Sequence, residues 1–170
     1  SHNGPDDLIQ VDTNGSVEKT QELMQSTDVD VATGGGAMVK SAYSSGKPSF
    51  GVGAGNVPVI IDRNIDLKEA IEKIVDGASF DHGIICSHEQ FVFAPEENFD
   101  ETIELFTNTG KVWFTNDQDQ IQKLREVVFL DGNLNKDIVG KSASYVGKLA
   151  GIDIPDSSRL IVLPAEGCGT

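Results

Sequence analysis

Strand-like and helix-like segments alternate along this chain, and that alternation limits the fold more than any other feature. The clearest helix is expected from Asn64, with Asp66 and Glu69 spaced as a capping box. Its apolar residues recur with a period of 3.6: Leu67, Ala70, Ile71, Ile74, Val75 and Ala78. This pattern predicts an amphipathic helix that covers a hydrophobic core.

The remaining segments are shorter but follow the same alternation. Strands are expected at residues 8–11, 28–32, 59–61, 90–94, 111–114 and 159–163. Further helices are expected at residues 17–24 (capped by Ser16), 37–44, 97–106 and 118–128, and residues 132–140 are expected to form an exposed connection. Neighbouring parallel strands need crossover connections, which helices supply. The chain is therefore predicted to be an α/β protein with a mainly parallel sheet covered by helices.

Length and composition narrow the range of possible functions. The 170 residues are 38% hydrophobic, enough for one medium domain or parts of two. Asp and Glu total 27 against 13 Lys and Arg, a net charge of −14, which argues against nucleic acid or an anionic membrane surface as a partner. No apolar stretch approaches the length of a membrane span.

The two cysteines, Cys86 and Cys168, form no CxxC pair, and with His2, His82 and His88 they give no metal-ligand spacing. No metal site is expected. Reduced thiols and a cytoplasmic location are the preferred interpretation.

Cys86 lies where the long helix runs into a glycine-containing turn before a strand-like segment. Polar residues follow it, and functional residues concentrate at such junctions, so a reactive thiol is one interpretation. A partly buried structural cysteine, which behaves as a small hydrophobic residue, is the other. The local sequence leaves both open.

Two glycine clusters precede this cysteine. Thr33-Gly34-Gly35-Gly36 follows a strand and opens a helix, so its backbone N–H groups could hold a phosphate, or glycine could serve only the backbone of a tight turn. In the second cluster, Gly51, Gly53 and Gly55 alternate before the strand at residues 59–61. Their lack of side chains lets the backbone approach a ligand or a second segment closely.

Together these motifs resemble the CoA-acylating aldehyde dehydrogenases, of the ethanolamine- and propanediol-utilisation type or the aldehyde dehydrogenase half of bifunctional aldehyde-alcohol dehydrogenases. The matching segments are Val31-Ala32-Thr33-Gly34-Gly35-Gly36-Ala37-Met38-Val39, Tyr43-Ser44-Ser45-Gly46-Lys47-Pro48, Gly51-Val52-Gly53-Ala54-Gly55-Asn56-Val57-Pro58-Val59 and Phe80-Asp81-His82-Gly83-Ile84-Ile85-Cys86-Ser87-His88-Glu89-Gln90. The resemblance extends from about Leu8 to the end of the chain and is less diagnostic after Pro95.

The resemblance implies a reaction and its residues. Cys86 would attack the aldehyde, hydride would pass to NAD or NADP, and the thioester would be transferred to CoA. The Cys86 backbone N–H would donate to the developing oxyanion, and Thr33, Gly34, Gly35, Gly53 and Gly55 would contact the cofactor. Hydrolytic relatives carry a water-activating glutamate where this chain has Gly51 or Val52, and no carboxylate occurs from Phe50 to Ile61. Glu89 is expected to be a loop or strand-end residue held by hydrogen bonds.

The resemblance also implies that the chain is part of a longer enzyme. Residues 1–48 would be the C-terminal part of a Rossmann-like cofactor domain and residues 49–170 a truncated catalytic domain, with roughly two thirds of the enzyme outside the chain. The full-length enzyme is expected to be a homo-oligomer, with association with a bacterial microcompartment as a further expectation. A hydrolytic aldehyde dehydrogenase and a catalytically inert nucleotide-binding or assembly module remain the alternatives, and Cys168 is expected to be a bystander.

Overall fold

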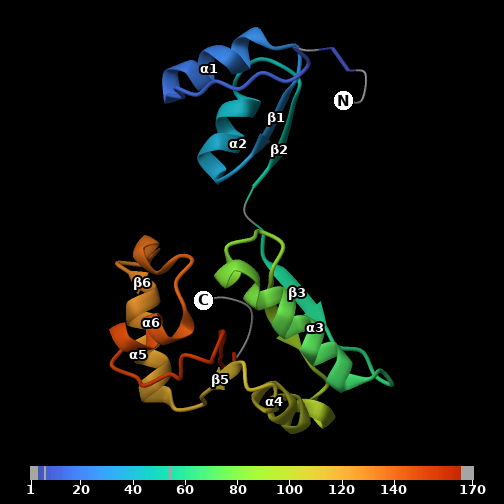
Figure 1. Ribbon diagram of the computed structural model, residues 1–170, viewed down its shortest axis with the longest axis vertical. Helices are drawn as coiled ribbons and strands as arrows, with labels where there is room; N and C mark the ends of the chain where they lie inside the picture. The colour runs from blue at the N-terminus through green and yellow to red at the C-terminus, as the bar shows by residue number, and fades with distance from the viewer. Residues whose placement is uncertain (1–3, 6, 54, 166–170) are drawn as a thin grey trace. The chain divides into compact units, whose positions relative to one another are not determined.

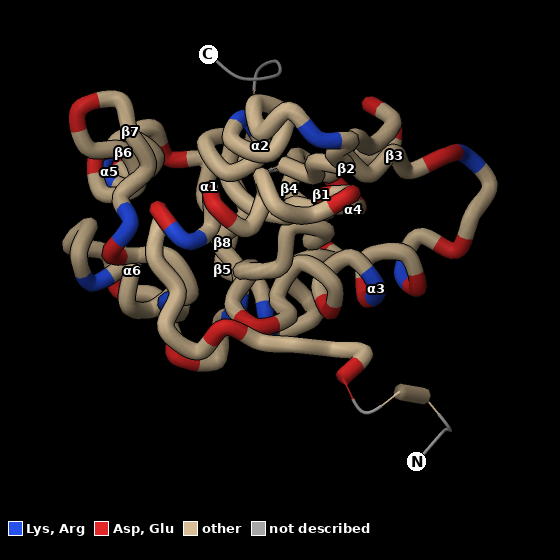
Figure 2. The backbone as a smooth tube through the Cα atoms, turned by 90° about the horizontal axis from the view of Figure 1, so that it is seen from above, with Lys and Arg blue, Asp and Glu red and all other residues tan. Residues whose placement is uncertain are grey.

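The computed structural model describes residues 4–5, 7–53 and 55–165, and the chain divides into two compact units, Ser1–Ala54 and Gly55–Thr170 (Figure 1). Each unit is described by itself. In Figure 2 the carboxylates and the cationic residues are interspersed along the described part of the chain, with the carboxylates in the majority.

The first unit is a pair of parallel strands with two helices. Its elements are α1 (Val17–Ser26), β1 (Asp30–Thr33), α2 (Gly36–Tyr43) and β2 (Ser49–Val52). The predicted cap of α1 is confirmed, because the Ser16 side chain accepts a hydrogen bond from the backbone N–H of Lys19. Met24, Ala32 and Ala42 form the small core of this unit.

Asp30 ties the loops of the first unit together. Its buried carboxylate accepts hydrogen bonds from the hydroxyls of Thr27 at 2.5 Å, Ser45 at 2.9 Å and Ser49 at 3.4 Å. The Thr27 hydrogen bond is the largest cause that holds the pKa of Asp30 below its usual value, and burial opposes it. The folded unit therefore favours the ionised form of this side chain.

One expectation for this unit is wrong. Residues 8–11 were expected to form a strand, but they are exposed and form none, because neither β1 nor β2 pairs with them. The expected domain boundary after residue 48 falls just before β2. That strand pairs with β1 in parallel, from Asp30 opposite Ser49 to Thr33 opposite Val52, so residues 49–52 belong to the first compact unit.

The second unit contains most of the helices and strands. They are β3 (Val57–Ile60), α3 (Leu67–Ser79), the turn η1 (Phe80–Gly83), β4 (Glu89–Phe93), η2 (Glu96–Asn98), α4 (Phe99–Asn108), β5 (Val112–Phe114), α5 (Gln118–Val128), β6 (Phe129–Leu130), β7 (Asn133–Leu134), η3 (Lys136–Ile138), α6 (Ala143–Leu149) and β8 (Leu160–Val162). β3 pairs with β4 and β5 pairs with β8, both in parallel, as the alternation predicted. These pairs are separate in the described residues rather than joined in one sheet.

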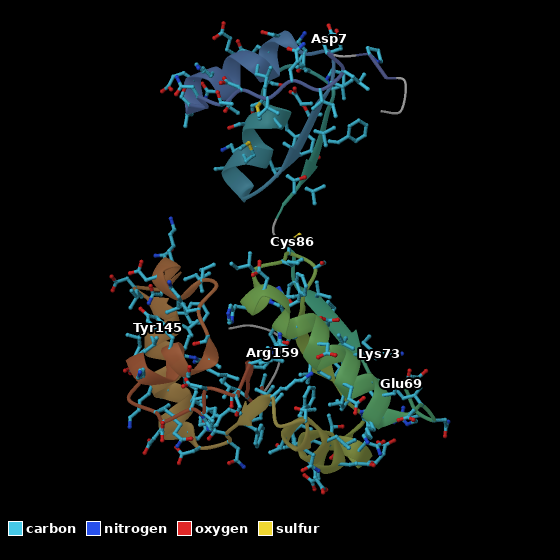
Figure 3. The ribbon with its side chains drawn as sticks, viewed as in Figure 1. Asp7, Glu69, Lys73, Cys86, Tyr145 and Arg159 are labelled. Carbon is cyan, nitrogen blue, oxygen red and sulfur yellow. The ribbon has the colours of Figure 1, made fainter. Side chains whose placement is uncertain are left out.

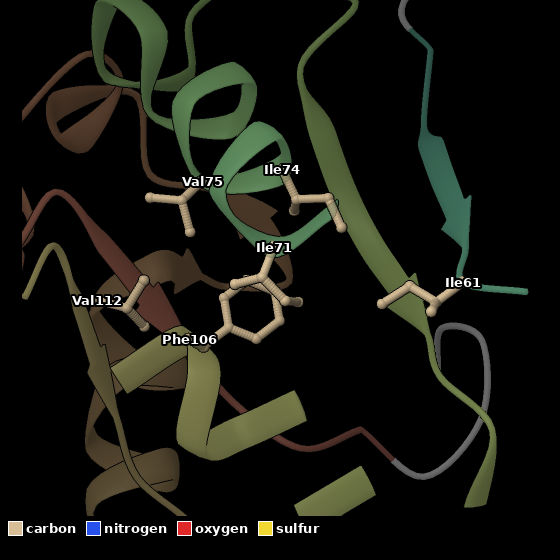
Figure 4. Packing of buried hydrophobic residues seen from close by; sticks show 6 residues of the cluster. All are labelled: Ile61, Ile71, Ile74, Val75, Phe106 and Val112. Carbon is tan, nitrogen blue, oxygen red and sulfur yellow. The ribbon is translucent and has the colours of Figure 1, made fainter. Parts of the chain in front are cut away.

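Helix α3 forms the centre of this unit. Asp66 caps it by accepting a hydrogen bond from the Glu69 N–H at 3.0 Å, and the apolar face predicted from the 3.6-residue period is buried. Figure 4 shows Ile71, Ile74 and Val75 of that face in one cluster with Phe106 and Val112. The main core cluster consists of Ile61, Ile71, Ile74, Val75, Phe106 and Val112. Burying one such side chain contributes about 1.5–3 kcal/mol, so α3 is fixed firmly in place.

Residues 132–140, expected to form an exposed connection, are largely exposed but contain β7 and η3. β6 and β7 form an antiparallel hairpin around Asp131 and Gly132, both with positive φ, as a two-residue Asp-Gly turn requires. The seven-residue helix α6 follows, with Ser142 as its cap. Gly147 lies inside this helix. A larger residue would not fit at this position, because a Cβ there would come within 2.8 Å of the Ile152 carbonyl oxygen. Close packing thus explains a residue that otherwise disfavours a helix.

Candidate functional site

The end of α3 turns the chain sharply toward Cys86. After Ser79 the backbone of Asp81 (φ 47°), His82 (φ 54°) and Gly83 (φ 71°) adopts left-handed conformations in succession. Residues other than glycine pay about 1–2 kcal/mol for such a conformation. The packed helix α3 contacts this strained turn and helps to hold it in place.

Cys86 lies at the tip of a tight turn between η1 and β4. The backbone N–H of His88 donates to the Ile85 carbonyl at 3.1 Å, so Cys86 and Ser87 are the two central residues of a β-turn. The His88 imidazole Nδ1 also contacts the Ile85 carbonyl oxygen. The thiol is exposed, and Figure 3 shows Cys86 at the end of its loop. Its own backbone N–H donates to no acceptor among the described residues.

Gly55 lies against the backbone of this turn. A Cβ on Gly55 would lie 3.5 Å from the carbonyl oxygen of Cys86. The approach follows from the pairing of β3 with β4, because the two segments enter neighbouring strands, and Val57 N–H also donates to the Gln90 side chain at 3.3 Å. The prediction that this glycine cluster approaches a second segment closely is confirmed at Gly51, where a Cβ would lie 2.6 Å from Cγ1 of Val39, while Gly55 makes an ordinary van der Waals contact.

A second contact with the turn is made by Gly140 and had no signal in the sequence. A Cβ on Gly140 would lie 2.5 Å from Cδ1 of Ile84, two residues before Cys86, and the φ of Gly140 is 72°. The backbone conformation therefore favours glycine here, and an added Cβ would also displace the end of the Ile84 side chain. Because the two residues are far apart in sequence, no local pattern could have revealed this support for the Cys86 turn.

Glu89, the first residue of β4, occupies an unusual position. Its carboxylate fills the space above Gly77 of α3, where a Cβ would lie 2.4 Å from Oε2. Oε2 is buried and has no hydrogen-bond partner among the described residues. The expectation of a strand-end residue is correct, but the expected hydrogen bonds to its side chain are not found in the described part of the chain.

The remaining candidate residues gather in the first unit, at the carboxyl ends of β1 and β2. Thr33 ends β1, the Gly34 N–H donates to the Val52 carbonyl at 3.0 Å, and Gly35 caps α2 without a side-chain bond. Gly53 follows β2, with Val39 the nearest side chain at 4.0 Å from a Cβ placed there. In open α/β sheets this edge of the strands is where ligands bind.

The backbone conformation of the Thr33–Gly36 turn does not explain its glycines. Gly34, Gly35 and Gly36 all lack a positive φ, which corrects the interpretation that the turn needs glycine for its backbone conformation. A Cβ on Gly35 or Gly36 would meet no described atom within 4 Å. The space over the start of α2 is therefore open to a ligand.

Two further features were tested on the residues that the structure describes. Within them, no group of three His, Cys, Asp or Glu side chains could hold a metal ion. Among the same residues, no helix is long and apolar enough to cross a membrane. Cys168 lies outside the described residues.

Comparisons with known proteins agree with this geometry. The chain is 43% identical over 165 residues to the acetylating succinate-semialdehyde dehydrogenase of Clostridium kluyveri, an alignment that covers 97% of this chain and 36% of that protein. Among solved structures, an acetylating aldehyde dehydrogenase from Geobacillus thermoglucosidasius matches with a TM-score of 0.85 and 38% identity, over 92% of this chain and 35% of that one. A Rhodopseudomonas palustris propionaldehyde dehydrogenase with bound propionyl-CoA matches with a TM-score of 0.80 and 32% identity, over 87% and 33%.

The 170 residues thus span about a third of the length of these relatives. The family model for the aldehyde dehydrogenase family matches residues 3–123, which include both glycine clusters and the Cys86 turn. The chain belongs to the aldehyde dehydrogenase family.

Proposed function

We propose that the full-length protein is an NAD(P)-dependent, CoA-acylating aldehyde dehydrogenase in which Cys86 is the nucleophile. The observation that carries the proposal is the exposed thiol at the tip of a turn supported by Gly55 and Gly140. The relatives support the acyl-transfer part, because two of them are named acetylating enzymes and a third binds an acyl-CoA.

In the proposed reaction the Cys86 thiolate adds to the aldehyde carbonyl carbon and forms a thiohemiacetal. The Cys86 N–H, which has no acceptor among the described residues, can donate to the oxygen that becomes negative. When bound, NAD(P)⁺ accepts the hydride that leaves the former carbonyl carbon, so that Cys86 then carries a thioester. Attack by the CoA thiolate on this thioester forms acyl-CoA and releases the Cys86 thiolate.

The residues proposed to contact the cofactor are Thr33, Gly34, Gly35, Gly53 and Gly55. Backbone N–H groups at the start of α2 have no partner within the helix and can donate to an anionic phosphate. The open space over Gly35 fits a bound group, since a Cβ there meets no described atom. In this proposal residues 1–48 are the C-terminal part of the cofactor domain, and residues 49–170 are part of the catalytic domain.

The fate of the thioester separates this proposal from a hydrolytic aldehyde dehydrogenase. Activating water for attack on a thioester needs a general base, and the chain has no carboxylate from Phe50 to Ile61. The absence of a base from this segment favours transfer to CoA. The homo-oligomer and the association with a bacterial microcompartment belong to the same proposal for the full-length protein.

The test is to measure NADH formation by the full-length protein, with and without CoA, while the products are identified. We expect turnover to require CoA and to yield acyl-CoA. Val52→Glu, at one of the two positions (Gly51 or Val52) that correspond to the glutamate of hydrolytic relatives, should raise the production of free acid without CoA, with Val52→Gln as the matched control. Rapid, CoA-independent release of free acid by the unmodified protein would instead assign it to the hydrolytic class.

A further inference from the structure

His88 closes the Cys86 turn through two of its atoms. Its backbone N–H donates to the Ile85 carbonyl oxygen at 3.1 Å, and its imidazole Nδ1 lies 2.5 Å from the same oxygen. A carbonyl oxygen only accepts hydrogen bonds, so Nδ1 carries a hydrogen in this contact. The neutral ring is therefore the Nδ1–H tautomer, and the Ile85 carbonyl has one donor for each of its two lone pairs.

The other edge of the His88 ring packs against the turn η1. Cδ2 and Nε2 of the ring each lie 3.5 Å from the place of a Cβ on Gly83, whose φ is 71°. The half-buried ring thus reaches from the Ile85 carbonyl oxygen to the backbone of Gly83. Contacts at both edges keep Nδ1 beside the carbonyl.

The Ile85 carbonyl belongs to the same peptide group as the Cys86 N–H. This peptide is trans, and a trans peptide is planar, so its C=O and N–H groups point in opposite directions. A contact that fixes the Ile85 carbonyl therefore fixes the direction of the Cys86 N–H. That N–H has no acceptor among the described residues, and it is the proposed donor to the oxygen that becomes negative.

The hydrogen bonds to the carbonyl also strengthen this donor. A peptide whose carbonyl oxygen accepts a hydrogen bond is more polarised, which strengthens the hydrogen bond from its N–H by about 10–30%. The peptide on the other side of Cys86 has a different neighbour, because its carbonyl oxygen is in van der Waals contact with Gly55. His88 therefore acts on the N–H side of the cysteine that Figure 3 shows at the end of its loop.

We propose that His88 is a positioning residue, whose Nδ1–H holds the Ile85 carbonyl so that the Cys86 N–H points at the oxygen that becomes negative. This inference rests on the proposed function of Cys86. His88 does not touch the substrate in this role. Its effect is confined to the steps in which a carbonyl oxygen gains negative charge, which are the addition of the thiolate to the aldehyde and the attack of CoA on the thioester.

A role only in shaping the turn would have a different signature. The thiolate of Cys86 displaces iodide from a saturated carbon when iodoacetamide alkylates it, so no oxyanion forms. The alkylation rate therefore reports the position and reactivity of the thiol alone. Replacing the His88 side chain leaves its backbone N–H in place, and the hydrogen bond from this N–H to Ile85 keeps the turn closed.

The first arm of the test compares two variants of similar shape in the full-length protein. His88→Asn keeps an N–H donor close to the position of Nδ1, whereas His88→Leu has no donor. Losing a whole oxyanion donor costs about a hundredfold to a thousandfold in kcat. His88→Leu keeps the Cys86 N–H and loosens only its direction, so we expect a smaller loss, about tenfold, in acyl-CoA formation. The kcat of His88→Asn should stay within threefold of the wild type.

Both variants should keep the rate of Cys86 alkylation within twofold of the wild type, with thermal unfolding to verify folding. His82→Asn, which removes an exposed histidine from η1, is the control and should leave both rates unchanged. Equal kcat values in His88→Asn and His88→Leu would overturn the proposal. A loss of alkylation in proportion to kcat would also overturn it, since the ring would then act on the whole turn.

Cys86→Ser, measured in parallel, separates a failure of this inference from a failure of the proposed function. If Cys86→Ser is inactive while His88→Leu matches the wild type, only the role of His88 is refuted. If Cys86→Ser keeps a tenth of the wild-type turnover, the nucleophile is wrong, and the positioning role is refuted with it.

The second arm does not depend on the folding of His88→Leu. The full-length protein is labelled with nitrogen-15 histidine, and a long-range proton–nitrogen correlation spectrum shows which nitrogen of each ring carries the hydrogen. The His88 signals are those missing from the spectrum of His88→Asn. We expect the hydrogen of the neutral His88 ring on Nδ1. A hydrogen on Nε2 instead would overturn the proposal, because Nδ1 could not then donate to the Ile85 carbonyl.

Discussion

The backbone of Gly55 lies against the main-chain carbonyl of Cys86, such that a Cβ on Gly55 would be 3.5 Å from that oxygen. This distance is an ordinary van der Waals contact for one carbon, but it leaves little room for more. The last glycine of the second cluster and the cysteine turn are therefore in van der Waals contact, and side chains larger than one carbon at residue 55 are expected to displace the turn.

The first prediction concerns that contact. Gly55→Ala should keep at least half of the wild-type rate of Cys86 alkylation by iodoacetamide, because its single carbon fits. Gly55→Val adds two methyl groups beside the turn and should lower acyl-CoA formation by the full-length protein at least tenfold. Equal rates of Cys86 alkylation and of acyl-CoA formation in the two variants would show that the size of residue 55 does not affect the turn.

Gly140 gives a second prediction with a matched control. Gly140→Ala places a carbon 2.5 Å from Ile84 Cδ1 and also strains the backbone at φ 72°. Gly132→Ala carries the same strain at φ 76° but meets no described atom within 4 Å. Each variant should lose about 1–2 kcal/mol of stability from the strain alone.

Only Gly140→Ala should also slow the alkylation of Cys86, by at least threefold, because only it displaces Ile84. The double variant Gly140→Ala/Ile84→Ala should recover that rate, since the contact is gone. If both single variants alter Cys86 reactivity equally, the Ile84 contact has no part in positioning the thiol.

The third prediction tests the proposed cofactor residues. Gly35→Val should raise the dissociation constant of NAD at least tenfold, or about 1.4 kcal/mol, because its side chain would occupy the open space over the start of α2. Gly15→Val is the control, since Gly15 precedes α1 and its Cβ also meets no described atom. Isothermal titration of the full-length variants, with thermal unfolding to verify folding, measures both. Unchanged affinity in folded Gly35→Val would remove this turn from the cofactor site.

Asp30 supplies a prediction for pH. Its pKa is lowered in the folded state, chiefly by the Thr27 hydroxyl, so the folded state favours the ionised carboxylate. The resulting stabilisation is present above the unfolded pKa of about 3.9 and is lost as pH falls through the lower folded pKa. Asp30→Asn should therefore be clearly destabilised relative to the wild type at pH 7, and the difference should shrink below about pH 4.

Urea unfolding followed by circular dichroism at several pH values measures this difference. Asp28→Asn, at an exposed position two residues earlier, is the control and should behave as the wild type throughout. A stability difference for Asp30→Asn that persists unchanged at low pH would assign the effect to packing instead of charge.

The sequence predicted the elements whose signals are local. α5 begins and ends where expected, at Gln118 and Val128, because Asp117 caps it with two backbone hydrogen bonds and its apolar residues keep the helical period. α3 shows the same agreement between cap and pattern. The parallel pairing also followed, since it depends on the alternation of helices and strands along the chain.

Features that depend on distant partners could not be predicted. The segment at residues 8–11 has the composition of a strand but no neighbouring strand to pair with in the described residues. At the candidate site, Cys86 was identified from its motif. Its contacts with Gly55 and, through Ile84, with Gly140 became evident only from the structure.

The central claim is that Cys86 carries the acyl group on its way to CoA. The most direct test incubates the full-length protein with an aldehyde and NAD⁺ but without CoA, then digests it for mass spectrometry. We expect an acyl adduct on the peptide that contains Cys86. Adding CoA should remove this adduct as acyl-CoA appears. A folded Cys86→Ser variant should lack the adduct and have a turnover at least a thousandfold lower than the wild type. An adduct on another residue, or a Cys86→Ser variant that keeps a tenth of the wild-type turnover, would contradict it.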